Sequence, residues 1–154
     1  MNGGNLKEKS DIFVVNFIFF LIFNFQFSTV MKGSIIREKS YAFALRVIKA
    51  YKYLNQEQRE FVLSKQVLRS GTSIGALVKE AEHAQSLADF VNKMNVALKE
   101  ANETEYWLML LKDSEYIDEK GFKSIHQDCS ELIKLLASIV KTSKEKLEKE
   151  KKDK

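Results

Sequence analysis

The chain has 154 residues, 45% of them apolar and 30% charged, and a net charge of +4. This length fits one domain with a sizeable core, and the composition is ordinary for a soluble protein. The absence of proline and the presence of only six glycines favour long uninterrupted helices over strands and turns. The single cysteine, Cys129, excludes an internal disulfide framework and a cysteine-based zinc cluster, so we expect a reduced, cytoplasmic setting.

Residues 1–30 differ in composition from the rest of the chain. They contain seven of the eleven phenylalanines, and eleven of the twelve residues from Ile12 to Phe23 are apolar. A membrane span needs roughly 20 apolar residues, and no small-residue cleavage site follows as in a signal peptide. We expect this extension to be AT-rich upstream DNA read as protein, with Met31 as the true start. A membrane anchor through residues 12–30, a cleaved signal and an added helix are the alternatives.

From residue 34 onward, apolar residues recur with helical spacing. The pattern predicts a first helix over about 34–54 and, after a tight break at Asn55 and Gln56, a second helix that starts near Glu57. A third helix should start after Ser86, which forms a capping-box-like pair with Asp89.

A fourth helix is predicted after Asp118. Four helices with short polar connections and seams of period about 3.5 predict an all-α protein, an antiparallel up-down four-helix bundle over residues 31–143. After Lys141 the apolar seam fades into alternating Lys and Glu, so residues 144–154 are expected to form a charged flexible tail.

The charges are distributed unevenly along the chain. Residues 31–79 contain ten Lys and Arg against three acids, residues 80–140 contain six against twelve, and residues 141–154 contain seven against four. A basic front half and an acidic back half predict complementary faces, either within the fold or between subunits. Scattered solvated charge is the simpler alternative.

The second predicted helix contains an unusual run of small residues: Ser70, Gly71, Thr72, Ser73, Ile74, Gly75 and Ala76. A phosphate-binding loop needs a Lys after its last Gly and a strand before it, whereas here Ala76 follows and a helix precedes. Each mid-helix Gly costs roughly 1 kcal/mol relative to Ala. We therefore predict that a neighbouring helix or another subunit approaches this backbone closely. A break between two shorter helices at Gly71 is the competing interpretation.

The sequence favours no catalytic, metal or cofactor site. Glu80 and His83 form one Glu-x-x-His pair of the kind used twice in di-metal bundles, but Lys123 stands where His126 would need its Glu. With two histidines in the chain, no nucleophile–histidine arrangement exists, and Cys129 falls on a core seam. Trp107 is interpreted as a core or subunit contact, with a base-stacking platform as the alternative. We expect a protein that is not an enzyme and needs no small-molecule substrate.

Basic residues cluster on the outward faces of the first two predicted helices. A stripe of this kind can follow a phosphate backbone, by charge and shape and not by base sequence. The candidate nucleic-acid-binding residues are Lys39, Arg46, Lys49, Lys52, Arg59, Lys65 and Arg69.

Several motifs resemble one bacterial family. They include Glu38-Lys39-Ser40-Tyr41-x-Phe43-Ala44, Tyr51-Lys52-Tyr53-Leu54, the block from Ser64 to Ala76, Ala97-Leu98-Lys99-Glu100-Ala101 and Glu103-Thr104-x-Tyr106-Trp107-Leu108. On these residues the chain from Met31 onward resembles the four-helix-bundle family encoded by intervening sequences within 23S ribosomal RNA genes.

The resemblance implies a homo-oligomer, in most members a pentameric ring, with no catalytic residues. The family is in turn similar to the accessory variability determinant of diversity-generating retroelements, which binds nucleic acid and a reverse transcriptase. The resulting expectation is a non-catalytic oligomer that binds RNA or DNA through its basic surface, with a reverse transcriptase as a further partner by analogy. The alternative is a structural or partner-binding oligomer without a nucleic-acid role.

Overall fold

The computed structural model describes residues 33–153, which form four helices and no strand. The first helix is described from residue 33 to residue 56, and it is followed by α2 (Leu63–Ala81), α3 (Leu87–Asp113) and α4 (Glu119–Lys152). The expectation of an all-α protein with four helices is confirmed. The predictions for residues 1–30 lie outside the described residues. The four helices are described here as parts of one compact unit, from Ile35 onward.

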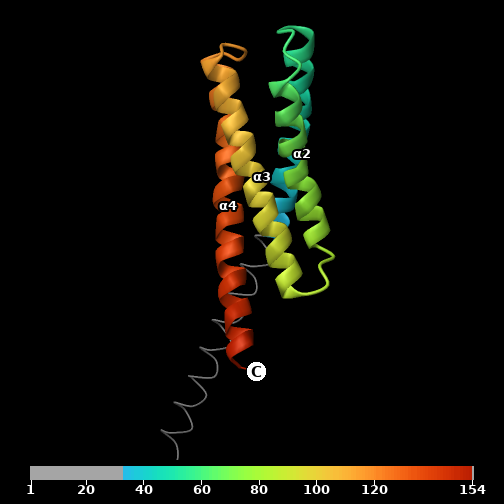
Figure 1. Cartoon of the computed structure of the whole chain (residues 1–154), viewed down its shortest axis with the longest axis vertical. Helices are drawn as coiled ribbons and strands as arrows, with labels where there is room; N and C mark the ends of the chain where they lie inside the picture. Colours follow the sequence, from blue (N-terminus) through green and yellow to red (C-terminus); the bar gives the residue numbers. More distant parts are fainter. Residues whose placement is uncertain (1–32, 154) are drawn as a thin grey trace, which may run out of the picture. The chain divides into compact units, whose positions relative to one another are not determined.

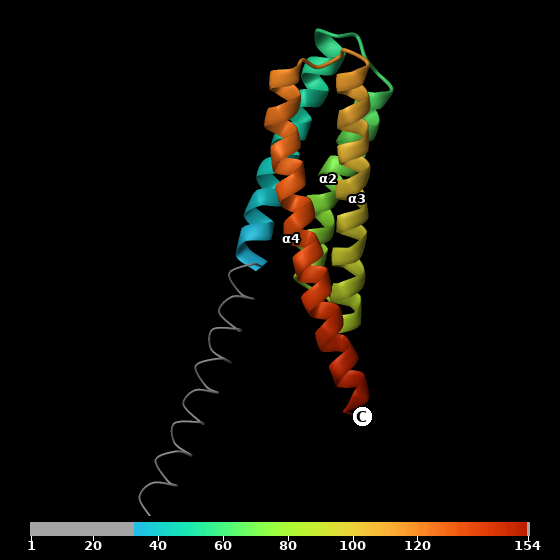
Figure 2. The ribbon, with the colours of Figure 1, turned by 90° about the vertical axis from the view of Figure 1, so that its left-hand side faces the viewer.

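Consecutive helices run in opposite directions along a common axis (Figure 1; Figure 2). One continuous hydrophobic core joins all four helices, because apolar positions recur every three or four residues along each of them. Among its most deeply buried side chains are Phe43, Ile74, Leu108 and Leu132, one from each helix in turn. The connections at residues 57–62 and 114–118 lie at the same end of this unit (Figure 2).

The start of α2 differs from the prediction. We expected the second helix to begin near Glu57, but α2 begins at Leu63 and the first helix continues through Asn55 to residue 56. The physical reason is Glu60, whose buried side chain accepts hydrogen bonds from the backbone N–H groups of Val62, Leu63 and Ser64, which follow it, at 2.9, 2.8 and 2.6 Å. These are the N–H groups that a helix start leaves without intrahelical partners. Glu60 therefore terminates the loop and starts α2.

The starts of α3 and α4 lie where the sequence predicted them. The Ser86 hydroxyl accepts the backbone N–H of Asp89 at 3.1 Å, as the predicted capping pair requires. At the start of α4, the Asp118 carboxylate accepts the N–H of Gly121 at 2.7 Å.

The end of α4 lies further along the chain than the apolar pattern indicated. The residues from 144 onward were predicted as a charged flexible tail, whereas α4 continues as a helix to Lys152. Lys, Glu and Leu are strong helix formers, and no glycine or proline follows Gly121 to interrupt them. Apolar burial ends at Val140, so the last turns of α4 are helix with little packing.

The run of small residues lies in the middle of α2, which is continuous, so the alternative of a helix break at Gly71 is wrong. A Cβ atom on Gly71 would lie 2.8 Å from Cγ2 of the buried Val47, and one on Gly75 would lie 3.4 Å from the backbone oxygen of Ser40. Both glycines therefore face the first helix at close range. The fully buried Ser70 faces α3 instead, where its hydroxyl accepts a hydrogen bond from that of Thr104 at 2.9 Å.

We predict that Gly71→Ala is less stable than Gly75→Ala by about 1–3 kcal/mol, which is the usual cost of overpacking a core. Both substitutions replace Gly by Ala inside α2, so the gain in helix propensity cancels in the comparison. Only the Gly71 variant forces the buried Val47 to move. Urea unfolding followed by circular dichroism measures the difference, and equal midpoints for the two variants would contradict this account.

A second prediction concerns Glu60. Burial raises the pKa of its carboxyl group, but the hydrogen bonds from the backbone of Ser64, Leu63 and Val62 outweigh this, and the pKa lies below its ordinary value of 4.5. A carboxylate with a lowered folded pKa stabilises the fold fully above its unfolded pKa, and this contribution is lost as the pH falls through the folded pKa. Glu60→Ala should therefore cost about 1–3 kcal/mol at pH 7. The difference between variant and parent should shrink below about pH 4.5.

The matched control is Glu57→Ala, which removes an exposed carboxylate from the same loop. It should change the free energy of unfolding by no more than about 0.5 kcal/mol. Equal losses for the two variants at pH 7, measured by urea unfolding, would show that Glu60 does not act as a cap.

Candidate nucleic-acid interface

The structure divides the seven predicted basic residues into two groups. Lys39, Arg46 and Arg69 each form an ion pair with an acid on another helix. The other four, which we call the basic end, have no ion pair with any residue described between 33 and 153. They are Lys49, Lys52, Arg59 and Lys65.

Arg46 connects the first helix to α4 through hydrogen bonds and an ion pair. One guanidinium nitrogen donates to the Ser124 backbone oxygen at 3.0 Å and pairs with the Asp128 carboxylate, and the other donates to the Ser124 hydroxyl at 2.7 Å. Lys39 makes a second contact between these helices, with its Nζ 2.9 Å from Oε2 of Glu131. Both cations therefore form contacts that connect the first helix to α4.

Arg69 plays a similar part between α2 and α3. Its Nη2 lies 2.5 Å from Oε1 of Glu103, and the indole N–H of Trp107 donates to the same oxygen at 3.1 Å. Trp107 is partly buried and packs against the core, which agrees with the core interpretation of this residue. Its neighbour Tyr106 is 55% exposed.

These pairs account for much of the charge asymmetry in the sequence. Cations from the basic half, among them Lys39, Arg46 and Arg69, meet acids from the acidic half within one chain. The complementary faces predicted from the sequence therefore lie, at these contacts, within the fold. Exposed ion pairs are worth about 0–1 kcal/mol each, so they orient helices more than they stabilise them.

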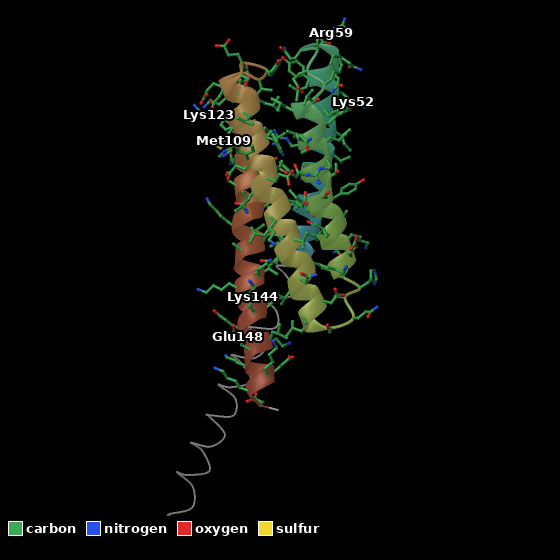
Figure 3. All side chains as sticks on the ribbon, viewed as in Figure 1. Lys52, Arg59, Met109, Lys123, Lys144 and Glu148 are labelled. Carbon is green, nitrogen blue, oxygen red and sulfur yellow. The ribbon has the colours of Figure 1, made fainter. Side chains whose placement is uncertain are left out.

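The basic end lies around the connection between the first helix and α2. Figure 3 shows Lys52 and Arg59 at this end of the unit, far from Lys144 and Glu148 near the end of α4. Lys49 lies one helical turn before Lys52, and Lys65 lies in the first turn of α2. All four side chains are exposed.

Folding leaves this loop with one exposed carboxylate. The segment from Lys49 to Lys65 also contains the acids Glu57 and Glu60. Glu60 is buried and bonded to backbone N–H groups, so Glu57 is the one exposed carboxylate that this segment presents. The loop residue Arg59 has a positive φ of 55°, a left-handed conformation that directs the chain into the Glu60 cap.

A cleft of about 430 Å³ opens beside the basic end, between the first helix and the α3–α4 connection. We call it the end cleft. Its wall is mostly apolar, and four polar or charged side chains lie along it. The polar lining residues are Arg46, Lys49, Tyr53 and Asp118, and the apolar ones are Ala50, Leu54, Val67, Leu108, Leu111, Ile117 and Ile125.

The residues considered for metal or nucleophilic chemistry are engaged elsewhere. Glu80 pairs with Lys93 at 2.9 Å, and Nε2 of His126 lies 2.9 Å from a Glu105 oxygen. Among residues 33–153, no group of three or more His, Cys, Asp or Glu side chains is placed to hold a metal ion. Cys129 is buried in the core, and this burial raises the pKa of its thiol to about 12. It therefore lacks the thiolate character of a nucleophile.

Two features of this region escaped the sequence analysis. The capping role of Glu60 had a local signal, an acid just before a helix start, but the apolar pattern placed that start too early. The end cleft had no local signal in the sequence, because its lining comes from four separate stretches of the chain.

No helix of the described part of the chain is long and apolar enough to cross a membrane.

The fold of residues 33–153 defines a class, the all-α proteins built of four helices. The sequence model of the 23S rRNA-intervening sequence protein family matches residues 32–138. The chain belongs to this family, as the resemblance in its motifs indicated.

A solved structure agrees with this assignment. It is the crystal structure of a protein of unknown function from the S23 ribosomal protein family of Bacteroides thetaiotaomicron VPI-5482. The two chains share 59% sequence identity with a TM-score of 0.71, over 71% of this chain and 98% of the other. No curated protein matches the chain.

Proposed function

We propose that this protein is a non-catalytic homo-oligomer that binds structured RNA through the basic end. The observation that carries the proposal is the position of the cations that are not used within the fold. Lys49, Lys52, Arg59 and Lys65 are exposed around one connection and have no ion pair within residues 33–153, and their segment presents one exposed carboxylate, Glu57. Such a group attracts phosphates by charge and shape.

The charges around the basic end indicate which path a phosphate backbone would take over the surface. In the neighbouring α3–α4 connection, Glu115 and Asp118 have no ion pair within residues 33–153 and would repel a phosphate backbone, whereas the adjoining Asp113 and Glu119 pair with Lys112 and Lys123. The phosphates would therefore follow the first helix and the start of α2. The family description, which refers to intervening sequences of 23S rRNA, makes RNA the first nucleic acid to test. A reverse transcriptase partner is carried over from the resemblance alone.

The test is a charge reversal at all four positions, Lys49→Glu, Lys52→Glu, Arg59→Glu and Lys65→Glu. At low salt this variant should bind a structured RNA at least about tenfold more weakly than the parent, because phosphate contacts dominate such binding. The slope of log K against log salt should become shallower by about 3, which is the loss of four phosphate contacts. Filter binding or fluorescence anisotropy over a salt series measures both.

The matched control reverses four exposed lysines near the end of α4: Lys144, Lys146, Lys149 and Lys151. It changes the net charge by the same amount at the other end of the unit. Equal weakening by the two variants would mean that net charge alone governs binding, and parental affinity in the first variant would refute an interface at the basic end.

A structural or partner-binding oligomer is the second candidate, and a specific groove favours it. The groove has a volume of about 590 Å³, lies between the first helix and α2, and is lined by residues that include Tyr41, Ala44, Gly75 and Ala76. Tyr41 is 67% exposed, and Leu45, one turn further along, is 45% exposed. Exposed apolar side chains beside a groove are typical of protein–protein contacts.

Gly75→Leu tests this candidate, because the added side chain would occupy the groove. In an assembly that uses the groove, the variant should sediment at a lower mass than the parent while retaining its helical circular dichroism. Gly75→Ala, which adds a single methyl at an ordinary contact distance, should assemble like the parent. An unchanged mass for Gly75→Leu would exclude this groove as a subunit contact.

A further inference from the structure

The end cleft adjoins the basic end and differs from it in chemistry. The basic end carries exposed positive charges, which suit phosphates, whereas the cleft is a concave, mostly apolar space. Its volume of about 430 Å³ lies within the range of about 300–1,000 Å³ that is typical of sites for small organic groups. Lys49 belongs to both, since it lines the cleft and is one of the four exposed cations.

Tyr53 gives the cleft an aromatic wall. Its side chain is 46% exposed, and its hydroxyl oxygen accepts a hydrogen bond from the Gln58 amide at 2.7 Å. The ring is therefore held in place by the loop that also carries Arg59. An aromatic ring beside unpaired cations is the combination on which nucleic-acid bases stack in proteins that bind unpaired strands.

Hydrogen-bonding groups lie at the margin of the cleft. Asp118 lines it, and one of its carboxylate oxygens accepts the Gly121 N–H at 2.7 Å as the cap of α4. A carboxylate can accept further hydrogen bonds, since each oxygen offers two lone pairs. The exocyclic amino and ring N–H groups of bases are donors of the matching kind.

From these observations we propose that the end cleft receives one unstacked nucleobase of a bound RNA, with its ring on Tyr53 and its backbone phosphate on Lys49. This inference rests on the proposed function, which supplies the phosphate contacts, and it names the substrate class: RNA that contains a bulged or otherwise unpaired nucleotide. A regular A-form helix keeps its bases stacked and presents none of them to such a cleft.

The experiment compares two RNA hairpins of equal length that differ only at a one-nucleotide bulge. One carries a bulged base, and the other carries an abasic nucleotide, which retains the phosphate and removes the base. The parent protein should bind the bulged hairpin about 5- to 100-fold more tightly, as expected for stacking of one base on an aromatic side chain. Both complexes should show the same salt slope, because the number of phosphates is unchanged.

Tyr53→Ala should reduce this ratio to about one without changing the salt slope, and Tyr53→Phe should preserve the ratio because it retains the ring. Circular dichroism checks that both variants fold, as expected for a half-exposed side chain.

A ratio of one in the parent overturns the base site while the loss of binding in the basic-end variant still supports the proposed function. If a second copy of the chain covers the cleft instead, Tyr53→Ala will change the sedimentation mass without RNA and leave the ratio unaltered, which also overturns the proposal.

Discussion

The close approach of the first helix and α2 is the contact on which the rest of this structure depends. At Gly71 the backbone of α2 lies so near the buried Val47 that a methyl group would collide with it. The adjacent Ser70 is buried on the side of α3, where it accepts a hydrogen bond from Thr104, so that α2 is held between two neighbours. The helix-propensity cost of glycine at the centre of α2 is offset by packing that a larger residue would prevent.

The ends of the helices depend on polar side chains more than on apolar ones. Glu60 determines where α2 starts, because three backbone N–H groups converge on its carboxylate. The same residue has a consequence for function. Its carboxylate is buried against backbone N–H groups, and Lys52, Arg59 and Lys65 remain exposed around the loop.

The distribution of ion pairs separates structural charge from surface charge. Arg46 and Arg69 reach acids on other helices and help to orient them, whereas the basic end has no such partners among residues 33–153. Both kinds of residue line the end cleft, the paired Arg46 and the unpaired Lys49. A group of exposed cations next to a mostly apolar cleft is the reason for assigning them different parts of the same ligand, the phosphates and a base.

The sequence by itself determined the helical class, the membership in a family and the identity of the close-packing run, because periodicity and small residues are local properties of the chain. It also placed the cap at Ser86 and the start of the fourth helix after Asp118 correctly, since both depend on residues within one turn of the chain. Only the tertiary structure decided which of the seven candidate cations remain available, because an ion pair such as that of Lys39 with Glu131 spans 92 positions of the chain. The same holds for the end cleft, whose lining converges from all four helices and therefore has no signature in any one segment.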